Sequence, residues 1–436
     1  MRVSVPSRRK TLNKLAKAKD ATLRRRVRDL LSKHFPPALS WYRAVRTEVH
    51  GVQGRLNRRN CGTYVAVTGS CGKSTTVHLL GRLFAKQGST NFATQRNMRS
   101  AVFRRLAKLS APTDYVVQEV SGHHPGAIAS VAGVMRHDIA VVTAVGSDHL
   151  SSFKEAAADE GGAHVADRVL ASVAREKRVL VETLRPGGIA CLNADDPRVR
   201  AMSASAPGRV VLFGVGADAE LRAENVTARW PERLSFDLVV GTTRHRVRTR
   251  FVGTLMLPSI LAALTAVHAS NADLGRAVAD LAHVNPFRLR MNVGVGTDGH
   301  TYVVDTFKAP LWQVERLIDD LPNLGAGPVV LVLGEVSDTR TDKSSIYRKL
   351  LRRASEVATQ VVGFGPAASS ANKVRAAGYG NVIGLETYGE TLAYLATLPP
   401  SLIILKSNRS VKLGTVWEMV KPAPAGDGKA AELTRG

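Results

Sequence analysis

From residue 64 onward, short runs of apolar residues alternate with longer stretches of helical periodicity. The runs predict strands at Tyr64–Thr68, Tyr115–Glu119, Ile139–Thr143, Ile189–Leu192 and Val210–Phe213. Because these runs are apolar throughout, they are typical of parallel strands buried on both faces. The stretches between them predict helices at Ser74–Lys86, Gly126–Met135 and Ala163–Leu184. This alternation predicts an α/β fold with a doubly wound, mostly parallel sheet.

The pattern then changes twice. Residues 221–252 alternate between polar and apolar, which predicts an antiparallel addition, and Ser259–Ala269 predicts a further helix. After Asn285-Pro286, which we interpret as a hinge, a second set of strands is expected at Tyr302–Val304, Val329–Leu333, Val361–Phe364 and Leu402–Leu405. We therefore expect a central α/β domain over residues 61–285. A smaller Rossmann-like domain is expected over 286–436, with a frayed tail from Pro422.

The first 60 residues form a basic leader. Apolar residues recur near a 3.6-residue period over 11–33, which predicts a helix ended by Pro36-Pro37, and a second helix is expected around Trp41–Val52. The leader contains 17 Lys and Arg against three acids, a local balance of +14 out of +25 for the whole chain. It is interpreted either as an arm packed on the body or as a contact for anionic lipid, nucleic acid or a protein partner.

Composition narrows the class of protein. No apolar run approaches the roughly 18 residues that a membrane span needs. The three cysteines, Cys61, Cys71 and Cys191, contain no C-x-x-C pair and cannot build a disulfide framework. We expect a cytoplasmic protein, with membrane association only through the leader.

A phosphate-binding loop follows the first strand and opens a helix. The segment Thr68-Gly69-Ser70-Cys71-Gly72-Lys73-Ser74-Thr75 is a shortened G-x-x-x-x-G-K-[ST] pattern, because Val67 stands where the first Gly would be. Glycines let backbone N–H groups close around phosphate oxygens, and the helix N-terminus adds a favourable dipole. Lys73 supplies positive charge to the phosphates, and Ser74 or Thr75 offers a hydroxyl to Mg²⁺.

Two later strands end in polar residues. Glu119 ends one strand, and Asp148-His149 follows another. Carboxyl ends of parallel strands meet at the ligand-binding edge of an open sheet, so Glu119 and His149 are expected beside the phosphate loop. A carboxylate at that place is a natural ligand for Mg²⁺.

Together these segments resemble the Mur ligases, and most closely the branch that adds D-alanyl-D-alanine. The similar segments are the phosphate loop, Glu119-Val-Ser-Gly-His-His124-Pro-Gly126-Ala-Ile128, Val142-Thr-Ala-Val-Gly-Ser-Asp-His149-Leu, the Asn193-Ala-Asp195-Asp196-Pro197 segment and Leu405-Lys406-Ser-Asn-Arg409. Their order and spacing hold from about residue 63 to 420. The family's usual N-terminal UDP-sugar-binding domain has no counterpart in the 60 leading residues.

The resemblance implies an ATP-dependent ligase. Such an enzyme activates a carboxylate as an acyl phosphate, an amine attacks, and an amide, ADP and phosphate result. It implies Glu119, His149 and Ser74 as Mg²⁺ ligands, and Asn193 as an adenine contact with Asp196 supporting its turn. ATP and Mg²⁺ are the expected cofactors. Gly69, Gly72, Lys73, Ser74 and Thr75 are the expected phosphate cradle.

Further residues follow from the same resemblance. Lys177 lies 16 positions before Asn193, where the family has a lysine that is often carbamylated, and it is expected to be catalytic with Lys73 and His149. Arg288 or Arg290 is expected to reach the phosphates from the hinge, and Asp305 and Lys308 are expected at the nucleotide. Candidate substrate residues are Asn97, Arg99, His124, Lys406 and Arg409.

Departures from the family leave the substrates open. The family's Gly-Asn-x-Asn-Asn segment appears here as Arg96-Asn97-Met98-Arg99-Ser100, whose arginines suit an anionic acid substrate. The expected partners are therefore an anionic acid and an amino acid or peptide amine. Two alternatives from other classes stay open at this point. One is a P-loop kinase, and the other is a nucleic-acid-binding NTPase suggested by the charge, although aromatic residues make up only 5% of the chain.

Overall fold

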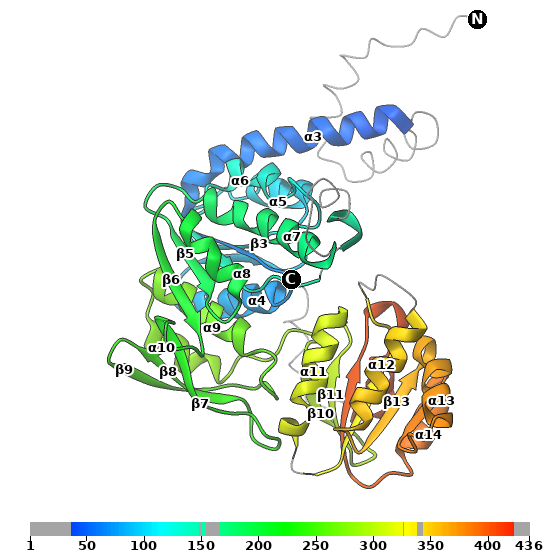
Figure 1. Cartoon of the computed structure of the whole chain (residues 1–436). Coiled ribbons are helices and arrows are strands. Elements are labelled where there is room, and N and C mark those ends of the chain that lie inside the picture. The colour runs from blue at the N-terminus through cyan, green and yellow to red at the C-terminus, as the bar shows by residue number, and fades with distance from the viewer. Residues whose placement is uncertain (1–35, 148–149, 154–164, 326, 338–342, 423–436) are drawn as a thin grey trace, which may run out of the picture.

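The protein contains two β-sheets with helices on both faces (Figure 1). The computed structural model describes residues 36–422 apart from 148–149, 154–164, 326 and 338–342. The large sheet has nine strands in the order β2-β3-β1-β4-β5-β6-β7-β8-β9, and the small sheet has six in the order β10-β11-β15-β12-β13-β14. The predicted α/β fold is confirmed.

The parallel part of the large sheet runs from β2 to β7. Its strands are β1 (Cys61–Thr68), β2 (Thr90–Ala93), β3 (Thr113–Glu119), β4 (Ile139–Val142), β5 (Ile189–Asn193), β6 (Arg209–Gly214) and β7 (Leu221–Thr227). All five strands predicted here from apolar runs are present. The short edge strand β2 was not predicted, because it is only partly buried and lacks a continuous apolar run.

Helices cover both faces of this sheet. They are α4 (Lys73–Phe84), α5 (Arg99–Leu106), α6 (Ala129–Met135), α7 (Val165–Glu182), α8 (Pro197–Arg200), α9 (Leu257–Ala269) and α10 (Leu274–Leu281). Helices α4 and α9 pack together on one face, and α5 and α6 lie on the other under the helix α3 (Pro36–Asn57). The second leader helix was thus predicted, but it is longer at both ends. The predicted helix over 11–33 lies outside the described residues.

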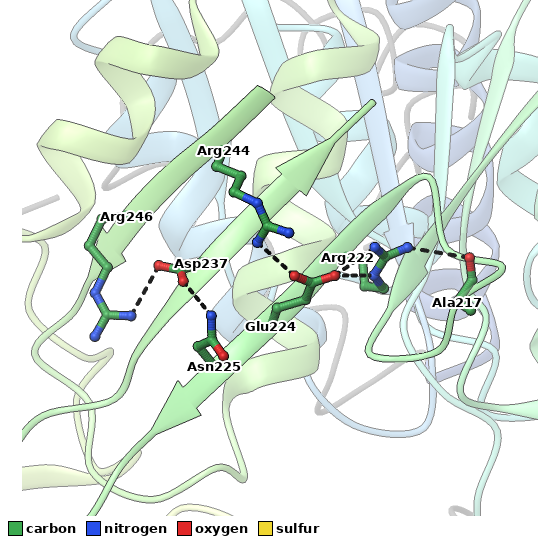
Figure 2. Close-up of polar contacts among 7 residues, drawn as sticks. All are labelled: Ala217, Arg222, Glu224, Asn225, Asp237, Arg244 and Arg246. Atoms are coloured by element: carbon green, nitrogen blue, oxygen red, sulfur yellow. Dashed lines mark hydrogen bonds and ion pairs between the residues drawn. The ribbon is translucent and has the colours of Figure 1, made fainter. Parts of the chain in front are cut away.

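The predicted antiparallel addition is formed by β7, β8 (Ser235–Val240) and β9 (Thr243–Arg248). Its exposed face alternates arginines with acids, as Figure 2 shows. Glu224 accepts hydrogen bonds from Arg222 and Arg244, and Asp237 accepts from Arg246. The hydrogen bonds from Arg222 and Arg244 lower the pKa of Glu224, and those from Asn225 and then Arg246 lower the pKa of Asp237. Each of these three arginines is therefore paired with a carboxylate of the same sheet.

The small sheet is parallel except for β10, which pairs antiparallel with β11. Its strands are β10 (Asn292–Val295), β11 (Thr301–Asp305), β12 (Val329–Leu333), β13 (Gln360–Phe364), β14 (Val382–Leu385) and β15 (Leu402–Lys406). Its helices are α11 (Leu311–Leu324), α12 (Lys343–Ser355), α13 (Ala368–Ala376), α14 (Tyr388–Leu395) and α15 (Thr415–Val420). The four strands predicted in this region are present. The unpredicted β10 and β14 are short and incompletely buried.

The two sheets share one apolar core. A single cluster extends from the α4 and α9 face of the large sheet, through Met291 and Leu324, to the α11 and α12 face of the small sheet. Hydrogen bonds also join the two sheets' helices and loops. Asp320 of α11 accepts hydrogen bonds from the backbone N–H and the hydroxyl of Thr254, at 2.8 and 3.0 Å. The carboxyl end of the large sheet consequently lies toward the small sheet (Figure 1).

Candidate active site

A cleft of about 470 Å³ opens between the phosphate loop and the small sheet. From the large sheet it is lined by Ser70–Ser74 of the loop, by Gln95 and Asn97, and by Glu119 and Ser121 after β3. From the small-sheet side it is lined by Arg290, Phe307, Lys308, Gln313, Asn408 and Arg409. Residues from both ends of the chain therefore face one another across a space large enough for a ligand.

The phosphate loop has the backbone that its sequence predicts. Gly69 and Gly72 have φ of +145° and +78°, and Gly72 directly precedes the first residue of α4. A Cβ on Gly69 would lie 2.0 Å from the Thr143 hydroxyl, so only glycine fits there. Lys73 begins α4 and donates from Nζ to the Gly69 carbonyl at 2.5 Å. The Lys73 ammonium therefore lies over the phosphate loop, where it is expected to bind phosphate.

The segment after β4 holds this loop in place. Ser70 donates from its backbone N–H to the Ala144 carbonyl, and its hydroxyl is bonded to both Gly146 N and Gly146 O. The Thr143 hydroxyl donates to the Cys71 carbonyl at 2.5 Å. These contacts fix the loop before any ligand arrives, which lowers the entropic cost of binding.

The Asn-x-Asp-Asp segment supports the same region from β5. Asn193 is buried and donates to the Thr143 carbonyl at 2.8 Å, while its own Oδ1 accepts from Asp195 N. Asp196 accepts from Val145 N and caps α8 by accepting from Arg198 N and Val199 N. The expected support of the turn by Asp196 is present. The Asn193 amide is engaged by backbone and does not line the cleft, and its contact with adenine stays a prediction.

Two oxygen ligands suited to Mg²⁺ lie together at the carboxyl edge. The Ser74 hydroxyl donates to Glu119 Oε2 at 2.9 Å, and both side chains are buried. Gln95 N and Asn97 Nδ2 also donate to the Glu119 carboxylate, at 2.8 and 2.9 Å. Asn97 therefore lies in the site, as predicted from the sequence. His149 lies outside the described residues, and Thr75 is buried behind the loop.

Other predicted substrate residues lie away from the cleft. Arg99 pairs with Glu48 of α3, at 2.6 Å, and its guanidinium stacks on Phe103. His124 is exposed and donates to the Pro125 carbonyl. Neither residue is among those that line the cleft.

Lys177 is almost fully buried in α7, with an exposed fraction of 2%. Its neighbour Glu176 accepts hydrogen bonds from Gly126 N and Ile128 N, both at 2.7 Å, and so ties α7 to the loop after β3. A long charged side chain is rarely buried to this extent in a surface helix. Its burial is unlike that of an ordinary surface lysine, although Lys177 does not line the cleft.

The small-sheet side contributes a buried ion pair and three cationic side chains, Arg290, Lys308 and Arg409. Lys406 at the end of β15 donates to Asp305 Oδ2 at 2.5 Å and to the Lys308 carbonyl at 3.1 Å, and the side chains of Lys406 and Asp305 are 1% and 3% exposed. Arg290 and Arg409 each stack on the Phe307 ring, at 4.6 and 5.5 Å from its centroid. The pair supports the Asp305–Lys308 segment, and the stacking holds two guanidinium groups at the cleft.

Of the two hinge arginines left open by the sequence, Arg290 lines the cleft and Arg288 is exposed outside it. Phe307 was missed by sequence analysis. The available signal was an aromatic residue two positions after Asp305, but its stacking partners are distant in the chain. His78 on α4 contacts the hinge itself, donating from Nε2 to the Asn285 carbonyl at 3.0 Å, and burial lowers its pKa.

Comparison with known proteins places these features in a family. The Mur ligase middle domain matches residues 67–267. The UDP-N-acetylmuramoyl-tripeptide–D-alanyl-D-alanine ligase of Mycobacterium leprae (strain TN) is 26% identical over 409 residues, covering 84% of this chain and 74% of that protein. The enzyme of the same name from Mycobacterium tuberculosis (strain ATCC 25618 / H37Rv) is also 26% identical, and the match covers 67% of this chain and 56% of that protein.

Solved structures share the fold. MurF from Acinetobacter baumannii aligns with a TM-score of 0.72 at 21% identity, covering 86% of this chain and 80% of that one. MurF from Thermotoga maritima, solved in complex with ADP, aligns with a TM-score of 0.71 at 21% identity, covering 86% and 83%. With the phosphate loop, the carboxylate after β3 and the two-sheet architecture already in place, residues 67–267 match a Mur ligase middle domain, and the chain as a whole is similar to Mur ligases, which are ATP-dependent, peptide-forming ligases.

Proposed function

We propose that this chain joins the carboxylate of an anionic acid to the amine of an amino acid or peptide, in a reaction that converts ATP to ADP and phosphate. The observation that carries the proposal is the cleft between the sheets, where Lys73, Ser74 and Glu119 face Lys308, Arg290 and Arg409. Cations on both sides suit a reaction in which negative charge develops on a transferring phosphoryl group and then on an acyl phosphate.

The large-sheet side is proposed to hold ATP. The N–H groups of the phosphate loop and the Lys73 ammonium would bind the phosphates. Ser74 and Glu119 fit Mg²⁺, because a hydroxyl and a carboxylate 2.9 Å apart are hard oxygen donors beside the phosphate loop. We propose His149 as a further ligand. When bound, the metal would neutralise charge on the phosphates.

The small-sheet side is proposed to complete the site. Arg290 and Arg409 would neutralise the transferring phosphoryl group, and their stacking on Phe307 helps to keep both guanidinium groups oriented at the cleft. The Lys406–Asp305 pair is proposed to position Lys308 through the bond to its carbonyl. We place the boundary between the two domains at residues 285 and 286, where His78 anchors the hinge.

Lys177 is proposed to be carbamylated and to act as an additional carboxylate near the metal. Its deep burial in α7 supports this proposal, because a charged lysine is rarely buried to this extent in a surface helix. Added mass of one CO₂ on the peptide containing Lys177, together with rescue of Lys177→Ala by short carboxylates, is the expected result. An unmodified lysine and a fully active Ala variant would contradict it.

The substrates are proposed by class. The D-alanyl-D-alanine-adding enzyme of Mycobacterium leprae suggests a short peptide or amino acid as the amine. Asn97, beside Glu119, is proposed to face the acid substrate. The basic residues 1–35 are proposed to attract anionic partners to a cytoplasmic enzyme, which deletion of these residues would test through loss of polyanion binding at unchanged ATP affinity.

The deciding experiment measures release of ADP and phosphate over a panel of acids and amines, with mass spectrometry of the product. A ligase gives an amide that requires both substrates. A kinase would give a phosphorylated product without any amine, and that result would refute the proposal. Lys73→Met is the matched inactive control, because it removes the ammonium while keeping the length of the side chain.

A further inference from the structure

Helix α3 presents its apolar stripe to solvent rather than to the body of the protein. The stripe consists of Trp41, Val45, Val49, Val52 and Leu56, spaced so that all five lie on one face of the helix. All five side chains are exposed, from 41% for Val45 to 63% for Val52. A surface helix of a soluble protein normally buries such a stripe, so this orientation requires an explanation.

The inward face of α3 fixes that orientation. It is made of Gly51, Gly54 and Asn57, which are buried against α5. A Cβ on Gly51 would lie 2.9 Å from the Phe103 ring, and one on Gly54 would lie 2.8 Å from Leu106 Cβ. Asn57 donates to the carbonyls of Leu106 and Ala107, at 3.2 and 3.0 Å. Close backbone packing therefore excludes rotation of the helix that would turn the valines inward.

An arginine-lined hollow lies at the C-terminal end of the stripe. It has a volume of about 380 Å³ and shares Leu56 with the stripe. Its other lining residues are Cys61 and the arginines 55, 58, 59, 136 and 185. Asp138 pairs with Arg58 and Arg185. Within the part of the chain that the structure describes, no carboxylate pairs with Arg55, Arg59 or Arg136.

The hollow is separate from the candidate active site. It lies beside Cys61, where β1 begins, whereas the phosphate loop follows Thr68, where β1 ends. Seven residue steps in a strand separate these ends by about 23 Å. Figure 1 shows α3 across α5 and α6 on the side of the large sheet that is remote from the small sheet.

We propose that α3 and this hollow dock the enzyme on an anionic phospholipid bilayer. The stripe would enter the interfacial layer, and the arginines would bind lipid phosphates. The positive charge around the stripe favours an anionic bilayer over other ways of covering it. Residues 36–60 contain five arginines against one acid, Glu48, which already pairs with Arg99.

The same charges disfavour the other candidates for covering the stripe. A second copy of the helix would bring like charges together. Residues 1–35, with 12 Lys and Arg against two acids, would also be repelled by the arginines but attracted to the same bilayer. Among the described helices none is both long and apolar enough to cross a membrane, so docking would be at the surface.

The test uses the full chain and vesicles of phosphatidylcholine with or without about a third of phosphatidylglycerol. Val49→Ser with Val52→Ser should weaken binding to anionic vesicles about tenfold, because each valine loses part of its transfer free energy. Arg59→Gln with Arg136→Gln should also weaken it at least tenfold, since each basic residue near an anionic surface adds to the binding. All four side chains are exposed, so the melting temperature should not change.

Matched controls come from surfaces outside the stripe and the hollow. Arg244→Gln with Arg246→Gln removes two charges from the sheet face in Figure 2 and should leave binding unchanged. Val215→Ser with Val295→Ser removes two valines that are 52% and 56% exposed elsewhere, and it should also have no effect.

Fluorescence localises the contact. Anionic vesicles should shift the emission of the protein to the blue, and Trp41→Phe should abolish the shift while the three other tryptophans remain. Inorganic phosphate should not produce it. The proposal fails if the stripe variant binds vesicles as tightly as the parent, or if the parent is a dimer without vesicle affinity that the stripe variant converts to a monomer.

Discussion

Replacing Asp305 with Asn should destabilise the small sheet strongly. The change leaves the Lys406 ammonium, 1% exposed, without its carboxylate partner at 2.5 Å and with only the Lys308 carbonyl at 3.1 Å. Removing one partner of a buried ion pair costs about 3–5 kcal/mol, because the remaining charge stays desolvated. For a domain of about 150 residues this corresponds to a decrease in melting temperature on the order of 10 °C.

A second substitution distinguishes this cause from general damage to β11. In Asp305→Asn with Lys406→Met, the buried charge is absent and an apolar chain of similar length fills its place, so most of the lost stability should return. Glu220→Gln is the control, because it breaks the exposed Arg209–Glu220 pair, whose partners are 56% and 38% exposed. A surface pair contributes about 0–1 kcal/mol, so its melting temperature should change little.

Thermal unfolding followed by circular dichroism at neutral pH measures all three variants. The reasoning is refuted if Asp305→Asn melts within 2 °C of the parent. It is also refuted if the double variant is less stable than Asp305→Asn alone, since the buried ammonium would then not be the source of the loss.

Three other predictions concern the large sheet. Lys73→Met should abolish ADP release without changing the melting temperature; turnover near that of the parent would exclude the phosphate-loop role. Glu119→Gln should raise the Mg²⁺ concentration needed for half-maximal turnover, because a neutral amide is a poorer ligand, and an unchanged requirement would count against the metal assignment. His137 donates to the Leu180 carbonyl, and burial lowers its pKa to about 4. Its unfolded imidazole takes up a proton near pH 6.5, so protons favour the unfolded state and about 3 kcal/mol of stability should be lost between pH 6.5 and pH 4. In urea titrations His137→Gln should show a smaller loss over this range, whereas identical pH profiles would contradict the assignment.

The sequence alone determined the elements whose signal is local. Continuous apolar runs predicted the strands β1, β3 and β12, because a buried parallel strand is apolar on both faces wherever it lies in a sheet. The phosphate loop could be predicted in the same way, because the end of the strand, the glycines, the lysine and the start of the helix follow one another within nine residues. The expectation that Glu119 meets the loop also held, because parallel strands share one carboxyl edge.

Only the tertiary structure decided contacts between distant residues and the orientation of surfaces. Asp305 and Lys406 are 101 residues apart in the sequence, and neither position predicts that they pair with each other. The choice of Arg290 over Arg288 at the cleft depends on the stacking against Phe307. The outward stripe of α3 is the reverse of what amphipathic periodicity predicts, because the glycines at 51 and 54 allow a backbone approach to α5 that valines on that face would prevent.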